Sequence, residues 1–226
     1  MKASAGSVYT VYNQYLKRYT ACQVAYIAPP DTVSKESWAV ILSLDWVGDA
    51  PLTAEELPHL HPLYKDFMYW PRDLHPLRVP VEIPPQYTLV GTLPPFTDQP
   101  CRSYGGWNDG YEVYRQIKWQ EIPEERRRAF KEAIESDGET EIGGKPVKVS
   151  SHRVIDQYTP FDFALELEAL PCLSEIICKQ WHPDLAEFLR GNPFIHELTL
   201  LNHGQRTLDL RGTSIGKLML DMTGLE

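Results

Sequence analysis

Three leucine triplets of the form L-x-L constrain this chain more than any other feature of its sequence. They recur every ten residues, and a small residue suited to a turn follows four residues after each triplet's second leucine. The leucines are Leu198, Leu200, Leu208, Leu210, Leu218 and Leu220, and the turn residues are Gly204, Ser214 and Gly224. Such a period predicts a repeat in which short strands bury their leucines only against neighbouring strands.

Ten residues are too few for a standard leucine-rich repeat. Either two units form one coil of about twenty residues, or the segment is an antiparallel meander of short hairpins. A parallel crossover needs a dozen or more residues, which favours the coils. We expect a short leucine-rich, solenoid-like or meander segment over residues 159–226, with the six leucines buried in stacked strands and 165–178 as its start.

The N-terminal part has the pattern of strands interrupted by proline. Residues 20–30 and 37–46 are rich in β-branched and aromatic side chains, and the second stretch is apolar on both faces, as a covered central strand would be. Ten prolines lie between Pro58 and Pro100. Because each fixes φ and removes a backbone donor, they predict loops and edge strands, with 86–93 as the best strand there.

Further elements follow from local signals. Thr53 can cap a short acidic helix that Pro58 ends. Alternating residues over 111–119 predict a strand, and proline before two glutamates predicts a helix over 123–136. Residues 145–156 again resemble a strand. The whole is an α+β fold, mostly β, in which an N-terminal mixed sheet domain over 1–158 precedes the leucine-rich segment over 159–226.

Charge limits the class of partner. The chain of 226 residues has 22 basic and 31 acidic residues, a formal net charge of −9. Because nucleic-acid affinity depends on cations that neutralise phosphates, we expect no nucleic acid as partner, and a basic protein as the complementary one. No signal peptide or long apolar run is present, so we expect a cytoplasmic protein without membrane contact. The four cysteines should be reduced and mostly buried.

No catalytic motif accompanies these elements. Phosphate loops, dinucleotide-binding glycines and zinc or serine hydrolase signatures are absent from the sequence. His59 and His61, with His75, could bind a metal, and His182 near Asp184 could serve acid–base chemistry. Solvated loop histidines and a helix-capping Asp184 explain the same residues. We therefore expect no enzyme, no metal and no cofactor.

Tryptophans and carboxylates near loops suit a surface for a basic protein. Between Asp45 and Asp66 five acidic residues accompany one base, Lys65, which gives a local net charge of −4. Trp119 is assigned to the core instead. The residues expected to bind a partner are Asp45, Trp46, Asp49, Glu55, Glu56, Trp70, Trp107 and Asp109.

One stretch of about 110 residues, over roughly 20–130, carries a family resemblance. A strand ends in Asp45 and Trp46, and an acidic E-E-L helix follows. Then come a P-x-x-Y strand that ends at Gly91 and a strand that begins at Gly110 and ends in I-K-W at Trp119. This order resembles immunity proteins of bacterial polymorphic toxin systems, which serve interbacterial competition. The leucine-rich segment departs from a compact single-domain immunity protein.

The resemblance implies a cytoplasmic antidote that binds and blocks a cognate toxin delivered by a neighbouring cell, without a cofactor. From the residues and this resemblance we expect an immunity protein that acts by stoichiometric occlusion. The alternatives are a leucine-rich, protein-binding adaptor with no toxin partner and an uncharacterised hydrolase.

Overall fold

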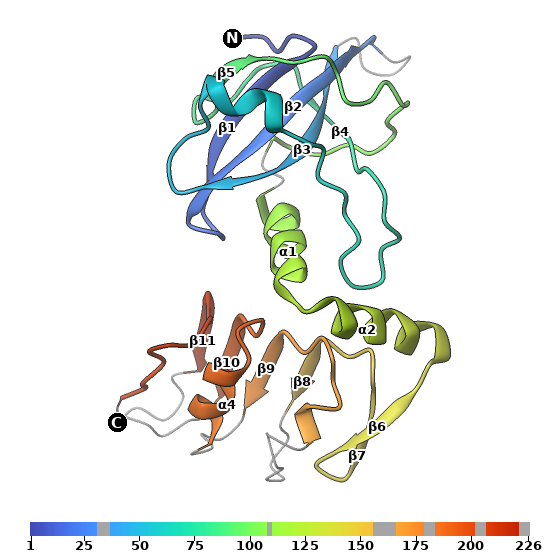
Figure 1. Ribbon diagram of the computed structural model, residues 1–226, viewed down its shortest axis with the longest axis vertical. Coiled ribbons are helices and arrows are strands. Elements are labelled where there is room, and N and C mark those ends of the chain that lie inside the picture. Colours follow the sequence, from blue (N-terminus) through green and yellow to red (C-terminus); the bar gives the residue numbers. More distant parts are fainter. Residues whose placement is uncertain (31–36, 108–109, 156–165, 179–183, 202–206, 222–226) are drawn as a thin grey trace. The chain divides into compact units, whose positions relative to one another are not determined.

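Two units make up the chain in a computed structural model, Met1–Ile117 and Lys118–Glu226, and each has its own sheet (Figure 1). The structure describes residues 1–30, 37–107, 110–155, 166–178, 184–201 and 207–221. Strand residues outnumber helical residues, which confirms the predicted α+β, mostly β class.

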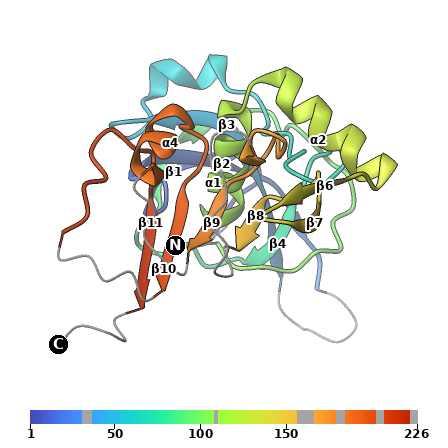
Figure 2. The same ribbon diagram turned by 90° about the horizontal axis from the view of Figure 1, so that it is seen from below.

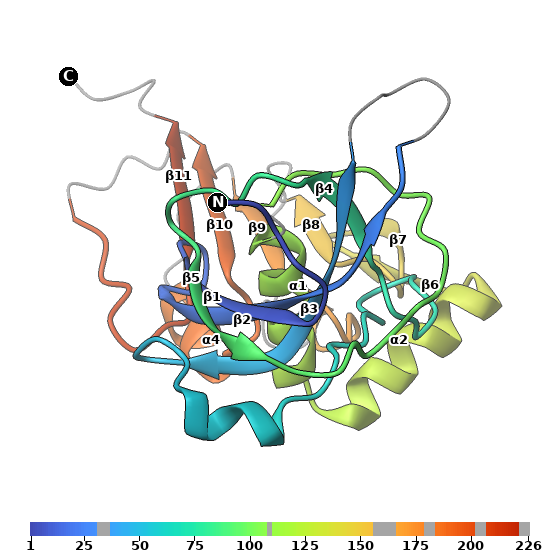
Figure 3. The ribbon, with the colours of Figure 1, turned by 90° about the horizontal axis from the view of Figure 1, so that it is seen from above.

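Unit 1 is built on a five-stranded sheet with the order β4-β3-β2-β1-β5 (Figure 3). All four pairings are antiparallel, so the sheet expected to be mixed is an antiparallel one. Its strands are β1 (Ser7–Asn13), β2 (Arg18–Ala28), β3 (Trp38–Gly48), β4 (Leu77–Pro80) and β5 (Thr88–Thr92).

Three predicted strands, over 20–30, 37–46 and 86–93, are confirmed as β2, β3 and β5. The proline-rich stretch supplies both edge strands of the sheet, β4 and β5, as the missing proline donors require. Strand β3 is interior and buried along most of its length, although β2 occupies the middle of the order.

Apolar side chains cover both faces of this sheet. Tyr9, Val24 and Ile41 belong to one buried cluster. Val8 and Leu44 belong to another, which Leu57 of the short 3-10 helix η1 (Ala54–His59) completes together with the flanking Leu52 and Leu60. The predicted short helix after Thr53 is therefore confirmed, but Pro58 lies inside it and does not end it.

The strand predicted over 111–119 is wrong, because these residues form helix α1 (Gly110–Glu121). Val113 and Gln116 are buried at a helical spacing. The buried Gln116 amide is fully used: its Nε2 donates to Asp66 Oδ1 (2.9 Å), and its Oε1 accepts from the Asp66 and Phe67 amides (2.8 and 3.1 Å). In a pattern of apolar and polar residues, Gln116 counts as an exposed polar residue. This assignment favoured the prediction of a strand with alternating faces over the prediction of a helix.

Unit 2 continues with α2 (Glu124–Ser136), which confirms the helix predicted over 123–136. The single strand expected over 145–156 is two strands, β7 (Lys145–Lys148) and β8 (Arg153–Ile155). Strand β7 forms a hairpin with β6 (Glu139–Ile142), and the connecting Gly143 and Gly144 both have positive φ.

A parallel sheet of four strands forms the rest of the described unit, in the order β11-β10-β9-β8 (Figure 2). Arg153, Glu175, Glu197 and Lys217 are in register, so successive strands are offset by 22, 22 and 20 residues. This spacing agrees with coils of about twenty residues, whereas a meander would be antiparallel. A complete solenoid stays a prediction. The remaining elements are β9 (Glu175–Cys178), α4 (Leu185–Gly191), β10 (Glu197–Leu201) and β11 (Lys217–Asp221).

The leucine prediction is right for one triplet only. Leu198 and Leu200 are buried in β10. The third triplet pairs with them in β11 but is exposed, and the second triplet lies outside the strands. The turn residues Gly204 and Gly224 are outside the described residues. The twenty-residue offset explains this outcome, since only alternate ten-residue units can be strands.

The boundary predicted near residue 158 lies inside unit 2, because β8 before it pairs with β9 after it. Trp119 is buried against Phe130, as expected of a core residue. Among the helices in the described ranges, none is long and apolar enough to cross a bilayer.

Candidate functional site

Asp45 and Asp49 lie at or just after the end of β3, and Glu55 and Glu56 lie on η1; we call these four carboxylates near one corner of the unit 1 sheet the acidic rim. All except Glu56 are exposed. The segment after η1 runs back along the end of β3, where the Asp45 amide donates to the His61 carbonyl (2.8 Å). The rim therefore stands on a fixed corner of the unit 1 sheet.

Trp46 organises the rim. Its Nε1 donates to Glu56 Oε1 (3.1 Å), and the Thr53 amide and hydroxyl donate to Glu56 Oε2 (2.9 and 3.1 Å). These bonds, the Thr53 amide above all, lower the pKa of Glu56. Gly48 permits the arrangement, since a Cβ there would lie 2.6 Å from the Trp46 ring. Trp46 is thus partly buried as a support for the rim.

Asp49 is the rim residue with a cationic neighbour. Arg18 Nε at the start of β2 lies 2.8 Å from its Oδ1, and the Asp49 side chain remains 89% exposed. This ion pair removes part of the negative field, so Asp45 and Glu55 carry the field that a partner would meet.

Two pairs of tyrosines near the β1–β2 turn were not predicted from the sequence: Tyr12 packs on Tyr19, and Tyr15 packs on Tyr111. We call Tyr12, Tyr15, Tyr19 and Tyr111 the tyrosine patch. The side chains of Tyr12, Tyr15 and Tyr111 are 48%, 51% and 40% exposed. Ring centroids are 5.3 Å apart for Tyr12 and Tyr19, and 5.1 Å apart for Tyr15 and Tyr111. Tyrosine clusters of this kind supply contact area at little cost in side-chain entropy.

The patch and the rim adjoin. Tyr12 of β1 pairs in register with Tyr19 of β2, and Tyr19 pairs with Gly48 of β3. The ion pair between Arg18 and Asp49 lies one residue further along both strands. One end of the sheet therefore presents exposed aromatic rings next to exposed carboxylates.

The other predicted binding residues do not belong to the acidic rim. Trp107 is buried in the core of unit 1, with its Nε1 bonded to the Pro80 carbonyl (2.8 Å), so it does not lie on the surface. Trp70 is half-buried, and its ring packs on that of His75, with ring centroids 4.5 Å apart. Asp109 lies outside the described residues.

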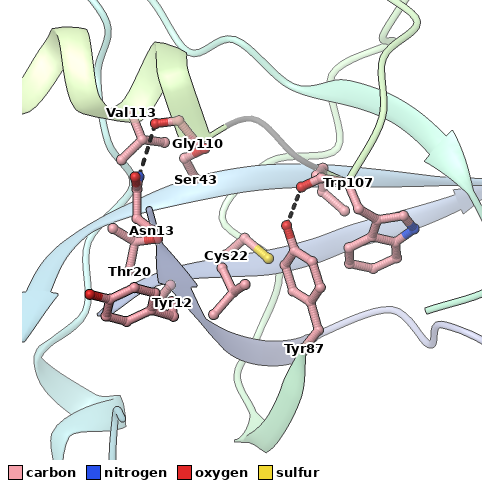
Figure 4. A pocket seen from close by; sticks show the side chains of 12 residues that line it. Tyr12, Asn13, Thr20, Cys22, Ser43, Tyr87, Trp107, Gly110 and Val113 are labelled. Carbon is pink, nitrogen blue, oxygen red and sulfur yellow. Dashed lines mark hydrogen bonds between the residues drawn. The ribbon is translucent and has the colours of Figure 1, made fainter. Parts of the chain in front are cut away.

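A cavity of about 40 Å³ lies behind the patch, between the sheet and the start of α1 (Figure 4). Its polar groups are used internally: Asn13 Nδ2 donates to the Gly110 carbonyl (2.9 Å), and the Tyr87 hydroxyl donates to the Trp107 carbonyl. Its described lining holds no histidine and no charged residue. Such a volume accommodates water, far below the size of a substrate pocket.

The candidate chemical groups are dispersed. Within the described ranges no three histidine, cysteine or acidic side chains group as metal ligands would. All four cysteines, Cys22, Cys101, Cys172 and Cys178, are buried free thiols, as predicted. Burial raises the pKa of Cys172 to about 12, against the opposing charge of Arg126. His182 lies outside the described residues.

Comparison with known proteins found no match to this chain among family models, curated proteins or solved structures.

Proposed function

We propose that this chain is an immunity protein of a bacterial polymorphic toxin system, and that it neutralises a cognate toxin in the cytoplasm by stoichiometric occlusion. The observation that carries the proposal is the contiguity of the acidic rim and the tyrosine patch on unit 1. Carboxylates select a basic protein surface, and exposed tyrosines supply the anchors that such an interface needs.

Occlusion requires affinity alone. The rim would accelerate encounter with a basic toxin, because opposite fields raise association rates. The patch would then slow dissociation, since buried aromatic rings account for most of the energy in protein interfaces. Neither step needs a nucleophile, a metal or a cofactor.

The test uses the toxin domain encoded by the gene directly upstream. Its activity is titrated with the purified full chain. A sharp endpoint at a fixed molar ratio supports occlusion. Loss of activity at sub-stoichiometric amounts would indicate turnover, and no loss at molar excess would contradict the proposed partner. Substitution of His59 or His61, which lie outside the patch and the rim, should leave the endpoint unchanged.

The parallel sheet of unit 2 favours a second candidate, a leucine-rich adaptor with no toxin partner. Its regular offsets of 22, 22 and 20 residues are typical of stacked coils, which often bind proteins. Protection of cells that express the upstream toxin separates the two candidates, because an adaptor would give none.

A further inference from the structure

Strand β11 leaves apolar side chains exposed at one end of the unit 2 sheet. Leu218, Met219 and Leu220 are 41%, 48% and 38% exposed. Their register partners on β10 include Leu198 and Leu200, which are fully buried. The same ladder is therefore covered at β10 and uncovered at β11, the last strand in the order.

The backbone of β11 has a defined outer edge. Lys217 donates its amide to the His196 carbonyl beside β10 (3.0 Å). Because a parallel strand directs alternate residues to opposite sides, Leu218 and Leu220 direct their amides and carbonyls away from β10. Within the described residues no strand pairs with that edge.

A row of charges crosses the sheet and ends at the same edge. Arg153, Glu175, Glu197 and Lys217 are in register on four successive strands. Arg153 Nε lies 2.7 Å from Glu175 Oε2, and Lys217 Nζ lies 2.7 Å from Glu197 Oε2. Each carboxylate in this row already faces a cation, so the next strand would best place an acid beside Lys217.

We propose that β11 pairs antiparallel with β11 of a second copy of this chain, about a two-fold axis at Met219. The sequence Lys-Leu-Met-Leu-Asp over 217–221 complements itself about that axis. Lys217 lies opposite Asp221 of the second copy, and Leu218 lies opposite its Leu220. The pairing joins two four-stranded sheets into one and covers the exposed leucines. This inference is independent of the proposed function.

The charges of Lys217 and Asp221 favour the register with its axis at Met219 over the registers with the axis one residue to either side. An axis at Leu218 would place Lys217 opposite Met219, and an axis at Leu220 would place Met219 opposite Asp221. The axis at Met219 alone pairs lysine with aspartate and leucine with leucine. It makes Leu218 and Leu220 the hydrogen-bonded pair and leaves positions 217 and 221 as a non-hydrogen-bonded pair.

Cysteine cross-linking of the full chain tests the register. Two copies of Met219→Cys face each other in a non-hydrogen-bonded pair, about 4.5 Å apart at Cα, within disulfide reach. The matched control Leu218→Cys is offset from its own copy by about 7 Å along the strands in addition to the strand spacing, which is too far. We expect oxidised dimers from Met219→Cys and from a mixture of Leu218→Cys with Leu220→Cys, but not from either of the latter alone. The buried native cysteines should give no background.

Sedimentation velocity of the unmodified chain across the micromolar range should show a dimer that weakens with salt. Asp221→Lys sets two lysine pairs against each other and should weaken dimerisation about tenfold, and Asp221→Asn should weaken it less. Circular dichroism checks that each variant is folded. A monomer at every concentration, or equal cross-linking by Met219→Cys and Leu218→Cys, would overturn the proposal.

Discussion

The Asn13 carboxamide donates to the Gly110 carbonyl (2.9 Å) across 97 positions of the chain, and its oxygen accepts from the Tyr15 and Leu16 amides (3.0 and 3.2 Å). One side chain thus closes the β1–β2 turn and joins it to the first turn of α1. This link brings Tyr15 against Tyr111, and so it builds the tyrosine patch.

Asn13→Asp removes only the hydrogen bond to α1. A carboxylate can still accept from the Tyr15 and Leu16 amides, but it cannot donate to the Gly110 carbonyl. We expect a loss of about 1–3 kcal/mol in the free energy of unfolding, since the partly buried Gly110 carbonyl loses this donor. Urea titration measures this loss. Asn13→Ala should cost at least as much because the turn bonds are lost too, and two variants as stable as the wild type would contradict the role of Asn13.

Charge reversal of the acidic rim should slow association with the proposed toxin partner. Asp45→Lys with Glu55→Lys leaves the Asp49 and Glu56 contacts in place, so the melting temperature should barely change. The association rate should fall and lose its salt dependence. The control Asp98→Lys reverses an exposed acid near Gln99, whose carbonyl accepts from Tyr26 at the opposite end of β2. Equal slowing by the control would argue against a local rim effect.

Truncation of the patch should weaken the complex after encounter. We expect Tyr15→Ala to cost about 2 kcal/mol of binding free energy, seen mainly in the dissociation rate, because the ring is an exposed aromatic anchor. Tyr69→Ala, at a more exposed tyrosine of the same unit outside the patch, serves as the control. Surface plasmon resonance gives both rates. If only the control weakened binding, the interface would lie elsewhere.

The loss of stability caused by leucine substitutions in unit 2 should depend on how deeply each leucine is buried, and not on its position in the ten-residue period. Leu198→Ala empties a fully buried site and should cost about 2–5 kcal/mol in the free energy of unfolding. Leu208→Ala should cost clearly less, because Leu208 is only half-buried and outside the strands. Chemical denaturation compares the two, and equal losses would restore the ten-residue repeat as the structural unit.

Burial lowers the pKa of His196 to about 4, and the Lys118 charge adds to the effect. The unfolded chain binds this proton near pH 6.5. Between these values the unfolded state holds more protons, so stability rises with pH and is lost as pH falls from about 6.5 towards 4, by about 3 kcal/mol in all. His196→Gln should show a smaller difference between urea midpoints at pH 7 and pH 4.5. An unchanged difference would show that other groups cause the acid sensitivity.

The sequence predicted the parts of the fold that depend on local patterns. Content of β-branched and aromatic residues identified β2 and β3. The prolines predicted edge strands between 58 and 100, with β5 located and β4 not, because a proline removes a backbone donor at its own position. Residues 111–119 alternate as well as they fit a helix, and the choice depends on Gln116, whose amide finds its partners at Asp66 and Phe67, far away in sequence.

The candidate site could be predicted in part. Local charge located the acidic rim, and the E-E-L helix was correct. The sequence alone could not distinguish Trp107 from a surface tryptophan, since its ring partners Tyr9 and Tyr87 lie in segments distant from it in the sequence. The tyrosine patch was missed for the same reason: the spacing of Tyr12, Tyr15 and Tyr19 is visible, but contact with α1 depends on a long-range bond.

The exposed positions of the rim and the patch lie at strand ends, in the β1–β2 turn and on η1 and α1, and none of them belongs to the two buried clusters that cover the sheet. Substitutions at such positions usually change stability by less than about 0.5 kcal/mol. Recognition can therefore diverge between related chains while the scaffold stays intact. Under the proposed function, a related chain that binds a different toxin could differ at Tyr15 or Glu55 and keep the same fold, so binding specificity and stability would evolve under separate constraints.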